Sequence, residues 1–126
     1  MTDTVLVRYI VADVDAAIAF YTTLLGFDVV MHPAPAFAML SRGALRLALT
    51  RPGGSGGGGQ AMPDGRLPEP GGWNRIALVV ADVGAEYERL REAGVKFRSD
   101  LITGVGGKQV ILEDPAGNPV ELFQYF

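Results

Sequence analysis

The sequence predicts an α+β fold built from two copies of one βαβββ unit. The tetrapeptide Val-Ala-Asp-Val occurs twice, at residues 11–14 and 80–83. Each copy is preceded by an apolar strand and followed by an amphipathic helix that ends at a glycine. Three short strand-like segments follow each helix, so both halves of the chain offer the same order of elements. Two such sheets, related by a pseudo-two-fold axis, would form a curled mixed sheet around a cleft.

The first half supports this order element by element. Residues 4–11 are mostly β-branched or apolar and include Arg8, which is typical of a strand. Asp13 can cap a helix because its carboxylate accepts free backbone N–H groups. Apolar residues then recur at helical spacing as far as Gly26, a helix-ending residue. Three further strands are predicted at residues 27–31, 37–40 and 44–50.

The second half repeats the pattern. Residues 73–80 resume strand character, Asp82 repeats the capping role, and Gly94 ends the second helix. A short strand is predicted at residues 95–97, and residues 102–107 read as a glycine-containing turn or an irregular strand. The remaining residues predict a closing hairpin.

That hairpin carries a carboxylate on its final strand. Residues 108–113 and 119–125 have strand character, and the sequence Asp-Pro-Ala-Gly-Asn-Pro at the reversal is rich in turn formers. Side chains alternate along a strand, so Glu121 and Phe123 share one face and Leu122 lies on the other. Burying a carboxylate in an apolar strand is costly without a partner. We therefore expect Glu121 to face a metal, a counter-charge or a wet cavity.

We expect one domain, residues 1–126, with the repeats at residues 4–50 and 73–126. The insert between them, residues 51–72, is too rich in glycine and proline for a helix or a central strand. It is either a mobile lid over a ligand or a plain linker.

Composition excludes several classes of function. The net charge is −3 and no basic face is visible, which argues against nucleic-acid binding. The absence of cysteine excludes disulfides and thiolate chemistry. Neither a signal peptide nor a membrane span is indicated, so we expect a cytoplasmic protein. The single histidine, His32, precedes a proline and has no partner visible in the sequence.

Three stretches carry a resemblance to a known family: residues 13–27, 81–95 and 114–122. Together they resemble the vicinal oxygen chelate superfamily, which includes glyoxalase I, extradiol dioxygenases, fosfomycin-resistance enzymes and bleomycin-resistance proteins. The resemblance implies the glyoxalase/bleomycin-resistance-like fold, made of two βαβββ repeats. It also implies a homodimer, as in the bleomycin-resistance branch.

Metal enzymes of this superfamily place up to four ligands on the cleft-facing strands, two in each repeat. Counting back from the capping aspartates puts the first-strand positions at Leu6 and Arg75, and the last-strand positions are Ala48 and Glu121. Leucine and alanine have no lone pair to give, and arginine is a permanent cation. A catalytic divalent ion needs about three protein ligands. We therefore expect no metal and no cofactor, and an ion pair between Arg75 and Glu121.

Two functions remain open. The first is a metal-free protein that binds or sequesters a small organic ligand, as in antibiotic resistance. Its expected ligand contacts are Arg8, Trp73, Arg75, Glu121 and Phe123, and the arginines favour an anionic or amphiphilic ligand. The second is a lyase or dioxygenase with a divalent metal on non-standard ligands, or with metal-independent acid–base chemistry at Glu121 together with a tyrosine or His32. The Arg75 pair can also be purely structural, and Arg8 can equally form a surface salt bridge at a strand edge.

Overall fold

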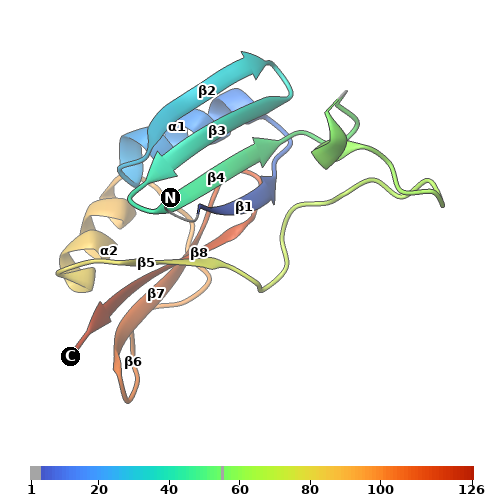
Figure 1. Ribbon diagram of the computed structural model, residues 1–126. Coiled ribbons are helices and arrows are strands. Elements are labelled where there is room, and N and C mark those ends of the chain that lie inside the picture. The colour runs from blue at the N-terminus through green and yellow to red at the C-terminus, as the bar shows by residue number, and fades with distance from the viewer. Residues whose placement is uncertain (1–3, 55) are drawn as a thin grey trace. The chain divides into compact units, whose positions relative to one another are not determined.

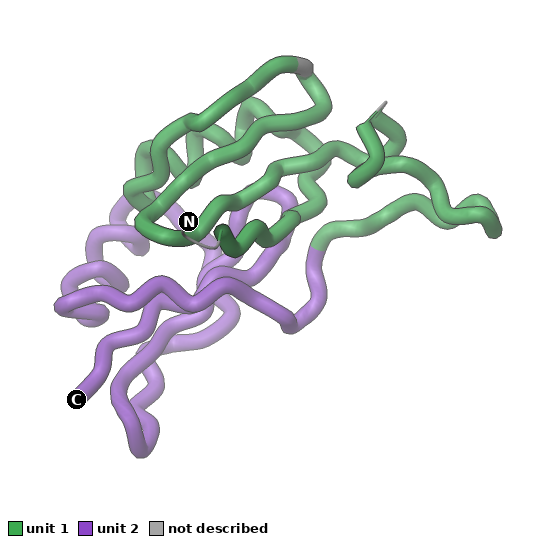
Figure 2. The backbone as a smooth tube through the Cα atoms, viewed as in Figure 1, with its two compact units in different colours: residues 1–70 green, residues 71–126 purple. Residues whose placement is uncertain are grey.

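The computed structural model describes residues 4–54 and 56–126. The chain divides into two compact units, residues 1–70 and residues 71–126 (Figure 2). The boundary between the units falls within the glycine- and proline-rich insert, whose residue 55 lies outside the described residues.

The described part of unit 1 contains a mixed four-stranded sheet and a helix (Figure 1). Its elements are β1 (Val5–Ile10), α1 (Val14–Leu24), β2 (Asp28–Ala34), β3 (Phe37–Arg42), β4 (Leu45–Thr50) and the short 3₁₀ helix η1 (Gly57–Gly59). The strand order is β1-β4-β3-β2, with β1 parallel to β4 and the other neighbours antiparallel. The last strand of the unit therefore lies in the interior of the sheet, beside the first.

Unit 2 has the same topology. Its elements are β5 (Ile76–Val79), α2 (Val83–Glu92), β6 (Ile102–Thr103), β7 (Gly107–Glu113) and β8 (Pro119–Tyr125). The order is β5-β8-β7-β6, and β5 is parallel to β8. Two βαβββ modules, each with a mixed four-stranded sheet, confirm the α+β class that the repeat predicts.

Both helices begin at the capping residues identified in the sequence. The N–H of Ala16 donates to Oδ1 of Asp13 at 3.1 Å, and the N–H of Ala85 donates to Oδ1 of Asp82 at 3.0 Å. Each bond satisfies a backbone donor that the first turn of a helix leaves free. At the other end of α2, Gly94 has a φ of +84°, a left-handed conformation that glycine adopts without strain.

One face of each sheet packs against its own helix: α1 lies on β3 and β4, and α2 lies on β7 and β8. Side chains buried on the α2 side of unit 2 include Ile76, Leu78, Val83, Leu90, Val110, Leu112, Val120 and Leu122. Burying one such side chain is worth about 1.5–3 kcal/mol. Because strand side chains alternate, Glu121 and Phe123 lie on the opposite face, away from α2.

The strand predicted at residues 95–97 is reduced to a single antiparallel bridge between Phe97 and Leu112. Next to this bridge, the N–H of Ile111 donates to the Ser99 hydroxyl at 3.0 Å instead of continuing a backbone ladder. A side-chain acceptor therefore takes the place of a strand partner.

Two other strand boundaries differ from the prediction. The strand expected at residues 73–80 spans only Ile76–Val79. The strand expected at residues 27–31 extends instead to Ala34, with register shifts against β3. It includes Pro33, which is tolerated because β2 is at the edge of the sheet and the missing N–H need not remove a ladder bond.

After β4 the insert forms η1 and then continues as an extended segment, coloured green to yellow in Figure 1. Neither an α-helix nor a strand is present among its described residues, as the glycine and proline content predicts. None of the described helices is long and apolar enough to cross a membrane.

Candidate ligand-binding site

Glu121 lies on the face of the unit 2 sheet opposite α2, next to apolar side chains. In the sheet register, Glu121 of β8 pairs with Ala77 of β5 and Ile111 of β7, and Phe123 pairs with Val79. Residues directly opposite each other on neighbouring strands share a face. The Glu121 side chain therefore has apolar neighbours on both adjacent strands, and a carboxylate in such a place needs a partner.

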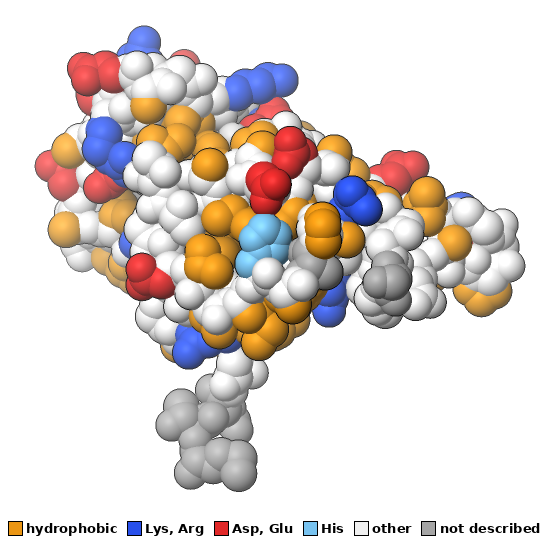
Figure 3. Space-filling model, turned by 90° about the horizontal axis from the view of Figure 1, so that it is seen from above, with side chains coloured by type: hydrophobic (Ala, Val, Ile, Leu, Met, Phe, Trp, Pro, Cys, Tyr) orange, Lys and Arg blue, Asp and Glu red, His pale blue; other side chains and the backbone are white. Residues whose placement is uncertain are grey.

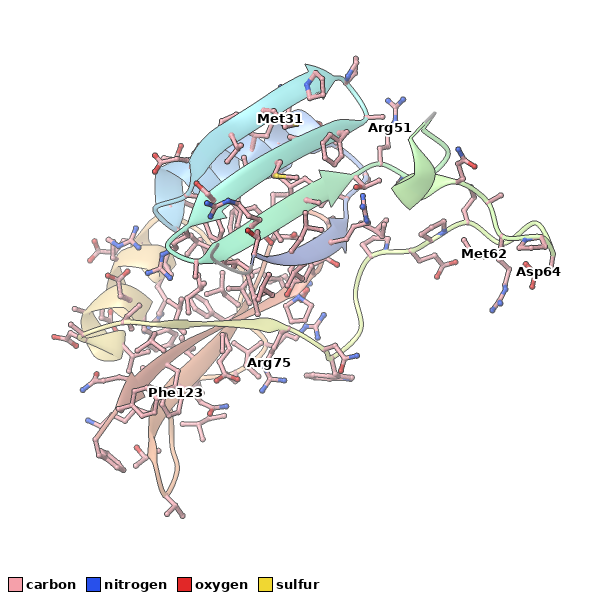
Figure 4. All side chains as sticks on the ribbon, in the orientation of Figure 1. Met31, Arg51, Met62, Asp64, Arg75 and Phe123 are labelled. Carbon is pink, nitrogen blue, oxygen red and sulfur yellow. The ribbon has the colours of Figure 1, made fainter. Side chains whose placement is uncertain are left out.

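Arg75, directly before β5, is that partner. Its Nε donates to Oε1 of Glu121 at 2.9 Å, and its Nη2 lies 2.8 Å from the same oxygen. Nη1 donates to the carbonyl of Trp73 at 3.2 Å. The side chains of Arg75 and Glu121 are only 26% and 13% exposed, so their attraction is less screened than that of a surface pair. The ion pair expected from the alignment of the repeats is present (Figure 4 labels Arg75).

The second carboxylate oxygen of Glu121 is left for another donor. Both contacts from Arg75 reach Oε1, and Oε2 receives no hydrogen bond from the described residues. An ionised carboxylate has about four lone-pair sites, so the group can accept further bonds. Glu121 is thus neutralised by Arg75 and still able to accept a hydrogen bond from a bound molecule.

Trp73 is stacked on Arg98. The guanidinium carbon lies 4.7 Å from the Trp73 ring centroid, a cation–π distance. Arg98 Nη2 donates to the Gly117 carbonyl at 2.8 Å, and Nη1 donates to the Gly72 carbonyl. Arg98 therefore ties the segment before β5 to the β7–β8 turn. The role of Arg98 was not predicted from the sequence, because this residue lies in an irregular segment without periodicity.

Aromatic and aliphatic side chains extend the apolar surface along β8. The rings of Phe123 and Tyr125 meet edge to face, with centroids 4.8 Å apart. Tyr125 is 67% exposed and Val79 is 54% exposed. Figure 4 labels Phe123 on this strand. Exposed apolar surface around a few fixed polar groups is the composition of many small-molecule sites.

The residues at the four metal-ligand positions do not fit a divalent cation. Leu6 and Ala48 lie on β1 and β4 of unit 1 and carry no donor atom. In unit 2, Arg75 is a cation and already engages the carboxylate of Glu121. Within the described ranges, no three His, Cys, Asp or Glu side chains are grouped so that they could hold a metal ion.

Arg8 belongs to unit 1, on β1. Its Nη1 donates to the Thr50 hydroxyl at 2.7 Å. The surface salt bridge considered for it is not formed with any acidic residue in the described part of the chain. The other four predicted contacts, Trp73, Arg75, Glu121 and Phe123, all belong to unit 2.

The single histidine lies at the surface of unit 1. Nε2 of His32 is 3.8 Å from Oδ1 of Asp15 on α1, a partner that the sequence analysis did not find. Figure 3, in which histidine is pale blue, shows it among hydrophobic side chains and beside acidic ones. An exposed pair at this distance contributes little to stability.

A family model for the glyoxalase/bleomycin resistance protein/dioxygenase superfamily matches residues 4–122. The chain belongs to this superfamily. The match covers both βαβββ modules, and it agrees with the resemblance carried by the two halves of the sequence.

Solved structures of the superfamily fold are similar along nearly the whole chain. An antibiotic-binding protein from a Streptomyces species, TnmS3, is 25% identical to this chain, with a TM-score of 0.75. The match covers 100% of this chain and 98% of TnmS3. A superfamily member from Sphaerobacter thermophilus is 27% identical with a TM-score of 0.77, covering 98% of each chain. A lactoylglutathione lyase from Agrobacterium tumefaciens is 22% identical, with a TM-score of 0.74. The match covers 98% of this chain and 94% of the lyase, and at this identity it supports a shared fold only. No curated protein matches the chain.

Proposed function

We propose that this protein binds, and by binding sequesters, a small organic molecule on the face of the unit 2 sheet opposite α2. The observation that carries the proposal is the Arg75–Glu121 ion pair, largely withdrawn from water and set in an apolar, partly aromatic face. A ligand on this face would cover Phe123 and Val79 and satisfy the free oxygen of Glu121.

A binding role without metal chemistry is supported by the donor atoms at this site. A metal-dependent lyase or dioxygenase would need about three protein ligands, and the four corresponding residues offer one carboxylate that already pairs with Arg75. The antibiotic-binding protein at 25% identity supports a small-molecule ligand. We propose a homodimer as the assembly, as the resemblance to the bleomycin-resistance branch implies.

The chemistry of the face favours a particular ligand. Arg75 can share its remaining donor capacity with an anionic group, while Oε2 of Glu121 suits a hydroxyl or amide donor. The exposed aromatic and branched side chains suit an aromatic or fused-ring body. We therefore propose an amphiphilic ligand, neutral or anionic overall, in preference to a cationic drug.

Thermal unfolding in the presence of a panel of aromatic antibiotics, ranging from anionic through neutral to cationic, tests the proposal. A ligand that binds only the folded chain raises the melting temperature by mass action. We expect neutral or anionic members to raise it and Phe123→Ala to weaken the effect, while Arg91→Gln on the exposed side of α2 leaves it unchanged.

The same assay examines the enzyme alternative. Mn²⁺, Ni²⁺ and Zn²⁺ should leave the melting temperature unchanged, and metal analysis of the purified protein should find no stoichiometric ion. A tightly held divalent ion, or a panel in which nothing binds, would contradict the proposal.

A further inference from the structure

A cavity of about 350 Å³ lies in unit 1, where the glycine-rich segment approaches the ends of β1 and β4. Two arginines, Arg8 and Arg51, line it together with Phe37, Thr50 and the glycines at 57 and 58. No aspartate or glutamate is among the described lining residues. The volume is at the lower end of the range typical of small-ligand sites, about 300–1,000 Å³.

Neither arginine of this cavity has a carboxylate partner in the part of the chain that the structure describes. Neither Arg8 nor Arg51 forms an ion pair with an acidic residue of the described ranges, although most of the other arginine side chains described here contact a carboxylate or a carbonyl. Arg8 makes a hydrogen bond to the neutral hydroxyl of Thr50, which is 4% exposed. Figure 4 shows Arg51 where β4 ends, close to η1. Among its described lining residues, the cavity therefore has cationic groups and no acidic side chain.

The guanidinium of Arg8 is held in place from two sides. The Thr50 hydroxyl accepts from Nη1, and the backbone of Gly58 packs directly against the guanidinium, so that a Cβ at position 58 would collide with it. A side chain at position 58 would therefore have to push the guanidinium of Arg8 aside. A side chain fixed in this way loses little rotamer freedom when it binds a ligand.

We propose that this cavity is a second binding site, which takes the carboxylate of a small organic acid with an aromatic or aliphatic body. The fork of N–H donors on Arg8 matches the two oxygens of a carboxylate, and Arg51 adds a second positive charge. Phe37 and Pro33 supply the apolar wall for the rest of the molecule. The site is built entirely from unit 1 and does not depend on the proposed role of the unit 2 sheet.

Benzoate and 1-naphthoate, compared with benzamide and 1-naphthamide, test the proposal on the full chain. The amides keep the shape of the acids and remove the charge. We expect calorimetric titration to show carboxylate binding at least tenfold tighter than amide binding, and to show it weakening as sodium chloride is added. Backbone NMR shifts in the unmodified protein should centre on glycines 57 and 58.

Two variants and one control connect binding to the site. Arg8→Gln should weaken naphthoate binding at least tenfold, and Gly58→Ala should weaken it as well because the new Cβ displaces the guanidinium. Arg66→Gln, at an exposed arginine that pairs with Asp64, is the matched control and should bind normally.

Several results would overturn the assignment. Equal affinity for the acid and the amide would show that the negative charge of the ligand is not recognised. Tighter binding of phenyl phosphate than of benzoate would assign the cavity to phosphate esters instead. NMR shifts confined to unit 2 would place the ligand elsewhere. Because the NMR and acid–amide comparisons use the unmodified chain, they decide the matter even if Arg8→Gln does not fold.

Discussion

Arg75 and Glu121 connect the beginning of unit 2 with its last strand. They are 46 residues apart in the sequence, and Nη2 of Arg75 lies 2.8 Å from Oε1 of Glu121. The contact runs beside the parallel β5–β8 pairing, which starts at Ile76 opposite Val120. The ion pair therefore lies where the first and last strands of unit 2 begin to pair.

Removing one partner should destabilise the chain. Glu121→Gln leaves the shielded guanidinium of Arg75 without a counter-charge, and we expect a loss of about 1–3 kcal/mol in the free energy of unfolding. Urea titration followed by circular dichroism measures it. Arg91→Gln breaks an exposed pair with Glu88 and should cost less than about 0.5 kcal/mol.

Replacing both partners should restore much of that loss. In the double variant Arg75→Met, Glu121→Leu no charge is left unpaired, and apolar side chains suit this face. We expect its stability to exceed that of Glu121→Gln in the same urea titration. If the double variant is no more stable than the single one, the ion pair provides stability that packing cannot replace.

The β7–β8 turn should depend on Asp114. Its Oδ1 accepts the N–H groups of Ala116 and Asn118, each at 2.9 Å, and the residue is 5% exposed. Asp114→Ala leaves these donors without that acceptor, and we expect a loss of about 2–3 kcal/mol, read from thermal unfolding. Asp64→Ala removes the acceptor from an exposed turn and should have a clearly smaller effect. Equal effects would mean that burial of the Asp114 turn adds nothing.

The Trp73–Arg98 stack should be visible in fluorescence, because Trp73 is the only tryptophan. Arg98→Gln removes the guanidinium from the ring and frees the preceding segment from the turn. We expect emission at longer wavelength and stronger quenching by acrylamide, a neutral quencher. Arg89→Gln, which breaks a pair with Glu86 on α2, should leave both unchanged. An unchanged spectrum for Arg98→Gln would show that the stack does not persist in solution.

Tyr87 should make stability sensitive to alkaline pH. Its hydroxyl donates to Oδ1 of Asp100 at 2.9 Å, and this bond to a carboxylate raises the pKa of Tyr87 above its ordinary value. Because the folded pKa is the higher one, the stabilisation is complete below the unfolded pKa and is lost as pH rises through the folded pKa. Tyr87→Phe and Asp100→Asn should each flatten the alkaline decline measured by urea titration. A decline that is unchanged in both variants would assign it to another group.

The repeat made the fold and the central contact of the site predictable. Asp13 and Asp82 fix equivalent points in the two modules, because a carboxylate cap marks the start of a helix in the sequence itself. Counting back from them gave Leu6 and Arg75 as equivalent positions, and the resemblance to the superfamily implied that Arg75 faces Glu121. An alternating strand then determined which face the carboxylate occupies, since a shift of one residue would reverse every side chain.

The contacts of irregular segments could not be predicted in the same way. Arg98 reaches the carbonyls of Gly72 and Gly117, and Gly58 packs on Arg8, through chain paths without periodicity. Such contacts depend on where a loop runs in space, and neither residue type nor spacing encodes that path. The shortened strand at residues 95–97 has the same origin, because a serine hydroxyl competes with the backbone acceptors.

The position of β4 and β8 has a consequence for synthesis of the protein. Each is the last strand of its unit to leave the ribosome, and each lies inside its sheet, between the first strand and the third. In a nascent unit, β1 therefore has no partner strand until β4 has been made, and β5 has none until β8 has been made. Until then the backbone N–H and C=O groups along these strand edges are unpaired. We expect folding of each module to be concerted, because the first strand cannot pair with its only neighbour in the sheet before the last strand is available.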